Sequence, residues 1–169
     1  MPYYRNYQTL YEYNITSISL EERKQIAHTI CKKIKKLNDL GFLYLDLHSN
    51  NILVRNNDIK IIDMDSCKLR DLLLYKDIGK DYYEQTLCDI ENYLSTLIMQ
   101  ILFGINLDVS IYLSLEKQKK LISKSSDKLK PFYTHAFELQ SKSTYNCEEY
   151  IDLSDETTIN DAKLILRLI

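Results

Sequence analysis

Two short β-branched runs joined by a turn are the feature that most constrains how this chain can fold. The runs are Ile52–Val54 and Ile59–Ile62, and the segment Arg55–Asp58 separates them. Two asparagines and an aspartate in that segment tolerate the left-handed conformations that tight turns require. The pattern therefore predicts a β-hairpin, because both runs have strand length and strand composition.

Three polar residues flank the predicted hairpin. Asp46 and Asn51 precede the first strand, and Asp63 follows the second. Sites are commonly built from the ends of strands and from the loops beside them, where the scaffold holds polar side chains near solvent. We therefore take Asp46, Asn51 and Asp63 as the first candidates for a functional site.

Helical patterns occupy most of the remaining chain. Ser19 and Glu22 have the spacing of a capping box, and apolar residues then recur at helical spacing as far as Leu40, before Gly41. A second apolar helix is predicted to begin at Asp89 and to end before Gly104. Three more are predicted at about 114–124, 129–141 and 159–168, and the acidic residues of 148–156 are predicted to form an exposed loop. The predicted fold class is mainly α with a small β-hairpin (α+β), as one domain over residues 1–169.

Composition narrows the classes of function. A formal net charge of −2 with 27% charged residues gives no electrostatic reason to expect nucleic acid or a membrane surface as partner. The apolar-rich run Leu94–Ile105 is too short to span a bilayer. Four widely spaced cysteines, without a CxxC pair, are typical of reduced thiols, and no basic-then-apolar leader opens the chain. We therefore expect a cytoplasmic location, with no nucleic acid or membrane partner.

The spacing of the three polar residues suits phosphoryl transfer. This reaction needs little covalent chemistry from the protein, so positioning and charge neutralisation dominate. Magnesium prefers hard oxygen ligands, commonly one or two carboxylates with phosphates and water. A separate carboxylate must orient the attacking hydroxyl and accept its proton. A D-x4-N loop followed by a further Asp after an apolar strand supplies all three roles.

The segments Asp46–Leu53 and Ile59–Asp65 resemble the catalytic loop and metal-binding turn of the protein-kinase-like superfamily. The resemblance implies the C-terminal lobe of that fold, with ATP and Mg²⁺ as the nucleotide and metal. It implies that Asp46 is the catalytic base, that Asn51 is a metal ligand and that Asp63 is the main magnesium ligand.

The resemblance extends over residues 1 to about 105. It implies that Met1–Tyr4 is the hinge strand, with Met1 and Tyr3 at the nucleotide, and that Thr9–Tyr13 is the short helix after it. It also implies that Asp89 leads the central helix and accepts backbone donors from the catalytic loop. His48 lies in that loop, where it either contacts the γ-phosphate or holds the loop in shape.

The departures from the family pattern concern both ends of the site. Tyr44-Leu45 stand where the family has His-Arg, so control by a phosphorylated activation loop loses its usual charge partner. The metal turn reads Asp-Met-Asp-Ser, as in atypical and small-molecule kinases, and places Asp65 where the family has Gly. Asp65 is either a second metal-facing carboxylate or a solvated turn residue. Only 25 residues separate Asp63 from Asp89, so the activation segment is shortened.

The resemblance covers no small lobe, since the chain has no glycine-rich loop and no ATP-binding lysine ahead of the hinge-like segment. The expected function is ATP- and Mg²⁺-dependent phosphotransfer to a protein Ser/Thr-type hydroxyl, conditional on a small lobe from a longer chain or a protein partner. One alternative is a pseudokinase or single-lobe scaffold that binds a protein partner. Another is a remnant of a small-molecule kinase. An open nucleotide pocket should leave apolar surface around Met1–Tyr7 and Ile59–Ile62.

Overall fold

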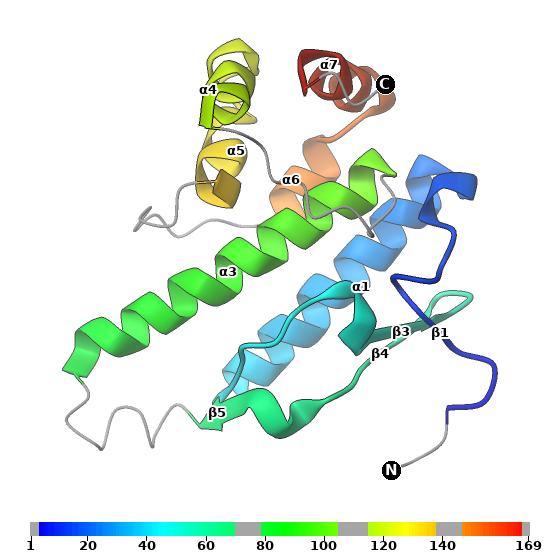
Figure 1. Ribbon diagram of the computed structural model, residues 1–169, viewed down its shortest axis with the longest axis vertical. Coiled ribbons are helices and arrows are strands. Elements are labelled where there is room, and N and C mark those ends of the chain that lie inside the picture. Colours follow the sequence, from blue (N-terminus) through cyan, green and yellow to red (C-terminus); the bar gives the residue numbers. More distant parts are fainter. Residues whose placement is uncertain (1–3, 70–78, 105–114, 138–146, 167–169) are drawn as a thin grey trace.

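The computed structural model describes residues 4–69, 79–104, 115–137 and 147–166. These residues form a mainly helical protein with two small antiparallel sheets, which confirms the predicted α+β class (Figure 1). The helices are α1 (Leu20–Asp39), α3 (Gly79–Phe103), α4 (Leu115–Lys124), α5 (Lys130–Phe137), α6 (Cys147–Leu153) and α7 (Glu156–Leu166). The strands are β1 (Gln8–Thr9), β2 (Phe42–Tyr44), β3 (Ile52–Arg55), β4 (Asp58–Ile61) and β5 (Cys67–Leu69). Short 3₁₀ turns are η1 (Ile15–Ser17), η2 (Ser49–Asn51) and η3 (Met64–Ser66).

Helix α1 begins and ends as its sequence predicts. The Ser19 hydroxyl accepts the backbone N–H of Glu22 at 3.2 Å, and the Glu22 carboxylate accepts the backbone N–H of Ser19 at 3.0 Å. This capping box satisfies two donors that a helix N-terminus otherwise leaves free. At the other end, Gly41 adopts a positive φ of 84°, which the absence of a Cβ atom permits.

The predicted hairpin is present and carries a third strand. β3 pairs with β4 in antiparallel register, from Ile52 opposite Ile61 to Arg55 opposite Asp58. Asn56 turns the chain with a φ of 54°, as expected of an asparagine in a tight turn. β1 pairs with the other side of β3, so the strand order is β1-β3-β4.

The N-terminal segment is fastened to the hairpin by side chains. The Tyr7 hydroxyl donates a hydrogen bond to the Asp58 carboxylate, and the Arg55 guanidinium lies 4.6 Å from the centre of the Tyr7 ring. The apolar surface expected on this hairpin is only partly present, because Ile59 is fully buried while Tyr4 is exposed. The prediction of an open apolar strand is wrong at Ile59 because this side chain belongs to the hydrophobic core.

A second sheet, absent from the sequence prediction, joins the loop before the hairpin to the segment after it. β2 and β5 pair in antiparallel register, with Tyr44 opposite Cys67 and Phe42 opposite Leu69. This pairing brings the chain on either side of the three candidate residues back together. The hairpin and the second sheet therefore frame one loop region.

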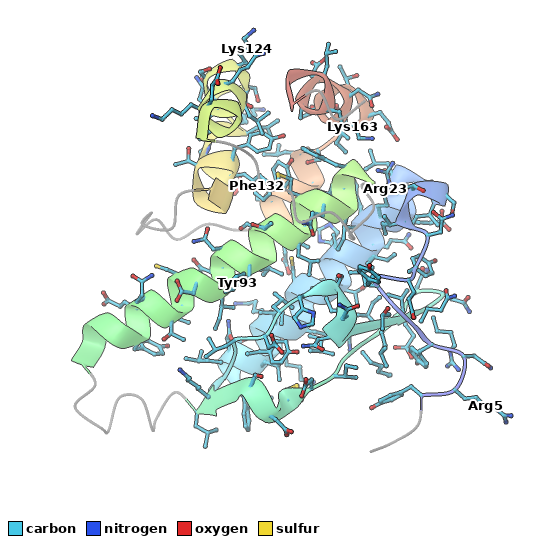
Figure 2. All side chains as sticks on the ribbon, viewed as in Figure 1. Arg5, Arg23, Tyr93, Lys124, Phe132 and Lys163 are labelled. Carbon is cyan, nitrogen blue, oxygen red and sulfur yellow. The ribbon has the colours of Figure 1, made fainter. Side chains whose placement is uncertain are left out.

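The hydrophobic core lies around α1 and α3, which run alongside each other in Figure 1. Both sheets lie on one side of this pair, and α4, α5 and α7 gather near the C-terminal end of α3. The ring of Phe132 on α5 stacks on Tyr150 of α6, with 3.4 Å between ring centroids. Arg23, labelled in Figure 2, reaches from α1 and donates a 2.6 Å hydrogen bond to the Leu102 carbonyl. None of the described helices is long and apolar enough to cross a membrane.

Three local predictions are wrong. The helix predicted from Asp89 begins ten residues earlier, at Gly79, so Asp89 lies within α3 and does not lead it. The acidic stretch predicted as an exposed loop forms α6 and the start of α7, because Tyr150, Ile151 and other apolar residues give it a buried face. Thr9–Tyr13 forms the end of a strand and a turn, in which Thr9 pairs with Leu53, so no helix forms there.

Candidate active site at the hairpin

The three candidate residues stand at the ends of short elements or just beyond them. Asp46 lies two residues after β2, Asn51 ends the 3₁₀ turn η2, and Asp63 lies two residues after β4. Within the loop, the backbone N–H of Asn51 donates to the carbonyl of His48 at 3.0 Å, which closes the turn. The loop conformation is therefore fixed by local hydrogen bonds as well as by the sheet.

Asn51 is the organising side chain of the loop. It is 7% exposed, and its Nδ2 lies 3.0 Å from the carbonyl oxygen of Asp46 and 2.9 Å from Asp46 Oδ2. An amide nitrogen carries two hydrogens, so both acceptors on Asp46 can be satisfied at once. Asn51 thereby holds the Asp46 carboxylate in one orientation and keeps its own Oδ1 as an acceptor.

His48 completes this group on its solvent side. Its Nδ1 accepts the backbone N–H of Asn50 at 3.3 Å, which places the proton of the neutral imidazole on Nε2. That Nε2–H faces Asp46 Oδ1 at 3.4 Å, whereas its 3.0 Å contact with Asn51 Nδ2 is not a hydrogen bond in this tautomer, because both nitrogens carry hydrogens. Nearly half of the His48 side chain is exposed, so the ring both supports Asp46 and faces solvent.

Tyr44 connects the loop to the strand that carries Asp63. Its side chain is fully buried, and its hydroxyl donates a 2.8 Å hydrogen bond to the carbonyl of Ile62. The backbone N–H of Ile62 donates to the carbonyl of Asn51 at 2.9 Å. Both backbone groups of Ile62 are thus bonded to the loop, so the residue before Asp63 is held from two sides.

The pKa of Tyr44 reflects the charges of both candidate carboxylates. Burial raises the pKa of Tyr44 to about 12, a hydrogen bond with Asn51 opposes the shift, and the negative charges of Asp46 and Asp63 add to it. Both carboxylates therefore lie close enough to the phenol to disfavour a second negative charge there. The structure brings Asp46, Asn51 and Asp63 together around one buried tyrosine.

Asp63 has an unusual backbone conformation. Its φ of 58° and ψ of 57° lie in the left-handed region, which is uncommon for a residue with a side chain. Such conformations persist where the surroundings enforce them, and they are frequent at functional sites. Here the bonds to Ile62 are the enforcing contacts. The Asp63 side chain is exposed, and no hydrogen bond or ion pair within the described residues occupies its carboxylate.

Asp65 lies in the 3₁₀ turn Met64–Ser66 and is exposed. Across the part of the chain that the structure describes, no three His, Cys, Asp or Glu side chains are grouped in a way that could hold a metal ion. The oxygen donors that the site does offer are the carboxylate of Asp63 and Oδ1 of Asn51. This set is too small for an all-protein cage but suits magnesium bound together with phosphates and water.

One expected contribution to the site is not found, and another falls outside the described residues. Asp89 was expected to accept backbone donors from the catalytic loop. Its Oδ1 instead accepts a 2.9 Å hydrogen bond from Gln85, one turn earlier on α3, and the described residues include no hydrogen bond from it to the loop. The expectation is wrong because Asp89 sits in mid-helix, where an exposed neighbour is the nearest donor. Met1 and Tyr3, the expected nucleotide contacts of the hinge, lie outside the described residues.

The residue that sequence reasoning missed is Tyr44. In the sequence it is only a departure from the His of the protein-kinase-like pattern, with no role predicted for it. A tyrosine within the apolar run directly before a D-x4-N loop is a signal for such a role, since a buried phenol needs a hydrogen-bond partner.

Comparison with models of known protein families finds no match to this chain, and a search of curated proteins finds none either. Proposals about its function therefore depend on the residues gathered around Tyr44.

Proposed function

We propose that this chain is the large lobe of a protein-kinase-like phosphotransferase, which acts on a protein hydroxyl of the Ser/Thr type. In this proposal Asp46 is the catalytic base, and Asn51 and Asp63 hold magnesium with the nucleotide phosphates. The reaction is conditional on a small lobe, supplied by a longer chain or by a partner protein.

One observation carries the proposal. The Tyr44 phenol donates to the backbone carbonyl of Ile62, and the backbone N–H of Ile62 donates to the backbone carbonyl of Asn51. These two hydrogen bonds connect the D-x4-N loop to the residue before Asp63. Phosphoryl transfer depends on holding a base and metal ligands in fixed relation, because charge stabilisation in a preorganised site costs no rearrangement during the reaction. A clamp of this kind supports a site that is organised before any ligand binds.

Asp46 is suited to orient a hydroxyl and accept its proton. Asn51 Nδ2 donates to Oδ2 at 2.9 Å, and His48 Nε2 faces Oδ1 at 3.4 Å, while 43% of the Asp46 side chain is exposed. A carboxylate held by two donors on its inner side keeps lone pairs for a hydroxyl on its outer side. Proton transfer requires this approach to within hydrogen-bond distance.

The residues present fit a magnesium-bound nucleotide in the chemistry of their donors. Asn51 Oδ1 is left as an acceptor because Nδ2 is engaged with Asp46, and no described residue occupies the Asp63 carboxylate. Bound Mg²⁺-ATP would supply the phosphoryl group and neutralise its charge. The side-chain contribution of His48 would be to keep Asp46 oriented.

Titration with Mn²⁺ tests the metal ligands. We expect paramagnetic broadening of the NMR signals around Asp63 in the folded chain, and loss of that broadening in Asp63→Ala. Asp161→Ala, at an exposed position of α7, is the matched control and should broaden like the wild type. Broadening that persists unchanged in Asp63→Ala contradicts the assignment.

Calorimetry tests the need for a small lobe. Nucleotide contacts come from both lobes of such an enzyme, and half a pocket cannot exclude water. We expect no measurable binding of ATP and Mg²⁺ by the monomeric chain alone. If ATP binds with micromolar affinity and this binding disappears in Asp63→Ala, the proposed phosphotransferase function stands, but the proposed requirement for a second lobe does not.

A second candidate function is a single-lobe scaffold that docks a protein partner. It is supported by large apolar side chains exposed beside the second sheet, where Phe42 and Leu69 are direct cross-strand partners and Leu40 is 62% exposed. Exposed apolar clusters on soluble proteins commonly mark interfaces. Asp46→Asn separates the two candidates, because it should abolish phosphotransfer in the assembled enzyme and leave partner binding by a scaffold unchanged.

A further inference from the structure

A cavity of about 370 Å³ lies between α1, α3 and α6, lined by residues that are separate from those of the proposed active site. Its apolar wall comes from Ile34 on α1 and from Ile90 and Leu94 on α3. Its deepest-buried polar groups are two thiols, Cys31 on α1 and Cys147 on α6, which are 4% and 7% exposed. Three helices therefore meet at a pair of sulfur atoms.

The remaining lining of the cavity is polar. Lys35, Asn38 and Asp39 come from α1, and Glu91 and Glu148 come from α3 and α6. Oδ1 of Asn38 is buried and has no hydrogen-bond partner among the described residues. A cavity with charged groups and unsatisfied acceptors is one that water and small polar solutes enter, whereas purely apolar cavities stay dry.

The two cysteines line the same cavity from neighbouring helices, Cys31 from α1 and Cys147 from α6. Ser95 Oγ on α3 lies 3.3 Å from Cys147 Sγ. Ser95 is fully buried, so its hydroxyl has been placed against the sulfur by the packing of the helices. Cys147 thus has a hydroxyl within hydrogen-bonding distance and a second thiol in the same cavity.

These contacts distinguish the two cysteines chemically. The hydrogen bond from Cys31 stabilises the Cys147 thiolate and lowers the pKa of Cys147, and the same bond with burial raises the pKa of Cys31. Burial and the charge of Glu91 oppose the change at Cys147, and the hydrogen bond with Ser95 supports it. Burial raises the pKa of Glu91 itself, which favours its neutral form and weakens that opposition. Cys147 is consequently the better nucleophile of the pair, since thiolates are the reactive form.

We propose that Cys31 and Cys147 form a peroxide-oxidisable dithiol site that closes into a disulfide between α1 and α6. The Cys147 thiolate attacks one oxygen of hydrogen peroxide, the O–O bond breaks, and the leaving hydroxide takes up a proton to become water. The product is a sulfenic acid on Cys147. Cys31 sulfur then attacks the Cys147 sulfur, the S–O bond breaks, and a second water leaves with the Cys31 proton. Two thiols are oxidised and one peroxide is reduced to two waters.

The other two cysteines provide the internal comparison. Cys67 lies on β5 and Cys88 on α3, both are partly exposed, and neither lines the cavity. Exposure alone would make them react first. If only the two buried cysteines pair, the cause would therefore be their position in one cavity, which gives peroxide access to both.

Peptide mapping tests the proposal on the full folded chain. The protein is treated with increasing hydrogen peroxide, denatured, alkylated without reductant and digested. We expect a cross-linked pair of peptides containing Cys31 and Cys147, lighter by two hydrogen atoms and separated again by dithiothreitol. The Cys67→Ser/Cys88→Ser double variant should give the same product without disturbing the pair. The disulfide should also raise the midpoint of thermal unfolding, since it closes a long loop.

The Cys31→Ser variant tests the order of the two steps. Its Cys147 should be trapped as a sulfenic acid by dimedone, because the resolving thiol is missing, and the near-UV circular dichroism spectrum reports whether it remains folded. The proposal would be overturned if Cys31 and Cys147 stay reduced at peroxide concentrations that oxidise Cys67. A disulfide that joins either of them to Cys67 or Cys88 would overturn it as well. If Cys31→Ser does not fold, peptide mapping of the Cys67→Ser/Cys88→Ser variant tests the proposal by itself.

Discussion

The Tyr44 hydroxyl donates a 2.8 Å hydrogen bond to the carbonyl of Ile62, the residue directly before Asp63. This bond crosses from the end of β2 to the end of β4, so it joins the two sheets at the point where the candidate site is built. Because the Tyr44 side chain is fully buried, no water competes for the bond. Tyr44 is therefore a positioning residue for Asp63, which lies in a left-handed backbone conformation.

Tyr44→Phe should destabilise the protein by about 1–3 kcal/mol, the usual cost of leaving a buried polar group without its partner. The Ile62 carbonyl loses its donor while the ring volume is kept, so packing is nearly unchanged. Denaturant unfolding measures the effect. Tyr93→Phe is the control, since Tyr93 is 53% exposed and its replacement should change stability by no more than about 0.5 kcal/mol. Equal effects of the two substitutions would show that the hydroxyl of Tyr44 contributes nothing.

Alkaline pH should weaken the wild type more steeply than Tyr44→Phe. The pKa of Tyr44 rises from 10.0 to about 12 on folding, so the folded state holds this proton more tightly than the unfolded chain. The stability that results is fully present below pH 10 and is lost as the pH rises toward 12. The phenylalanine variant should lack up to about 1.4 kcal/mol per pH unit of this slope. Tyr150, whose pKa burial also raises to about 12, keeps its contribution in both proteins.

Denaturant midpoints measured at pH 9, 10 and 11 would give the two slopes. Tyr93→Phe should follow the wild type, because Tyr93 is exposed to solvent. Parallel curves for the wild type and Tyr44→Phe would contradict the assignment of the buried proton to Tyr44.

The elements that sequence patterns predicted best are those whose signals are local. The capping box of Ser19 and Glu22 and the apolar stripe after it fixed α1 to within a residue of its observed start. The hairpin followed from two β-branched runs and an asparagine turn. In both cases the residues that determine the conformation are its immediate neighbours, so no knowledge of tertiary contacts was needed.

The elements that sequence patterns missed depend on distant partners. β1, β2 and β5 are two or three residues long, which is too short for a two-residue period to be visible, and each exists through pairing with a remote strand. α6 looked like an acidic loop because its carboxylates are exposed, whereas Cys147, Tyr150 and Ile151 bury one face. Likewise Asp46, Asn51 and Asp63 were predicted as a group, but the tyrosine that joins them is defined by a contact 18 residues away.

Gly104→Ala should be strongly destabilising. Gly104 ends α3 with a φ of 60°, where an alanine costs about 1–2 kcal/mol from conformation alone. A Cβ atom there would also lie 2.5 Å from Nη1 of Arg23, which donates to the Leu102 carbonyl. The total loss, measured by thermal or denaturant unfolding, should exceed the conformational cost.

A double-mutant cycle separates the two causes. In an Arg23→Ala background the crowding is absent, so Gly104→Ala should cost less than it does in the wild type, by an interaction energy of at least about 0.5 kcal/mol. Additive effects would show that only the backbone conformation matters at Gly104.

Asp89→Ala should change stability by no more than about 0.5 kcal/mol. Its carboxylate accepts a hydrogen bond from Gln85 on an exposed part of α3, and such surface contacts contribute little. A role in bracing the catalytic loop would instead predict a loss of about 1–3 kcal/mol, because buried backbone donors would lose their acceptor. Unfolding of this variant beside Gln85→Ala distinguishes the two outcomes, since a loss confined to Asp89→Ala would require a second partner.

Asn51→Asp should be destabilising at neutral pH and less so in acid. The substitution keeps the size of the side chain but replaces the Nδ2 that donates to Asp46 with a second carboxylate oxygen. Two carboxylates held in contact repel each other, which adds to the loss of about 1–3 kcal/mol expected when the part-buried Asp46 carbonyl loses its donor. Repulsion raises the folded-state pKa of the pair, so stability falls as pH rises through the carboxylate range and recovers in part near about pH 4.

The control for this variant is its neighbour. Asn50 is exposed, so Asn50→Asp adds the same charge to the same loop without placing it against Asp46. Urea unfolding of both variants between pH 4 and 7 would give the comparison, with the larger and pH-dependent loss expected for Asn51→Asp alone. Matching losses in the two variants would mean that loop charge, and not the hydrogen bond from Asn51, sets the stability of the site.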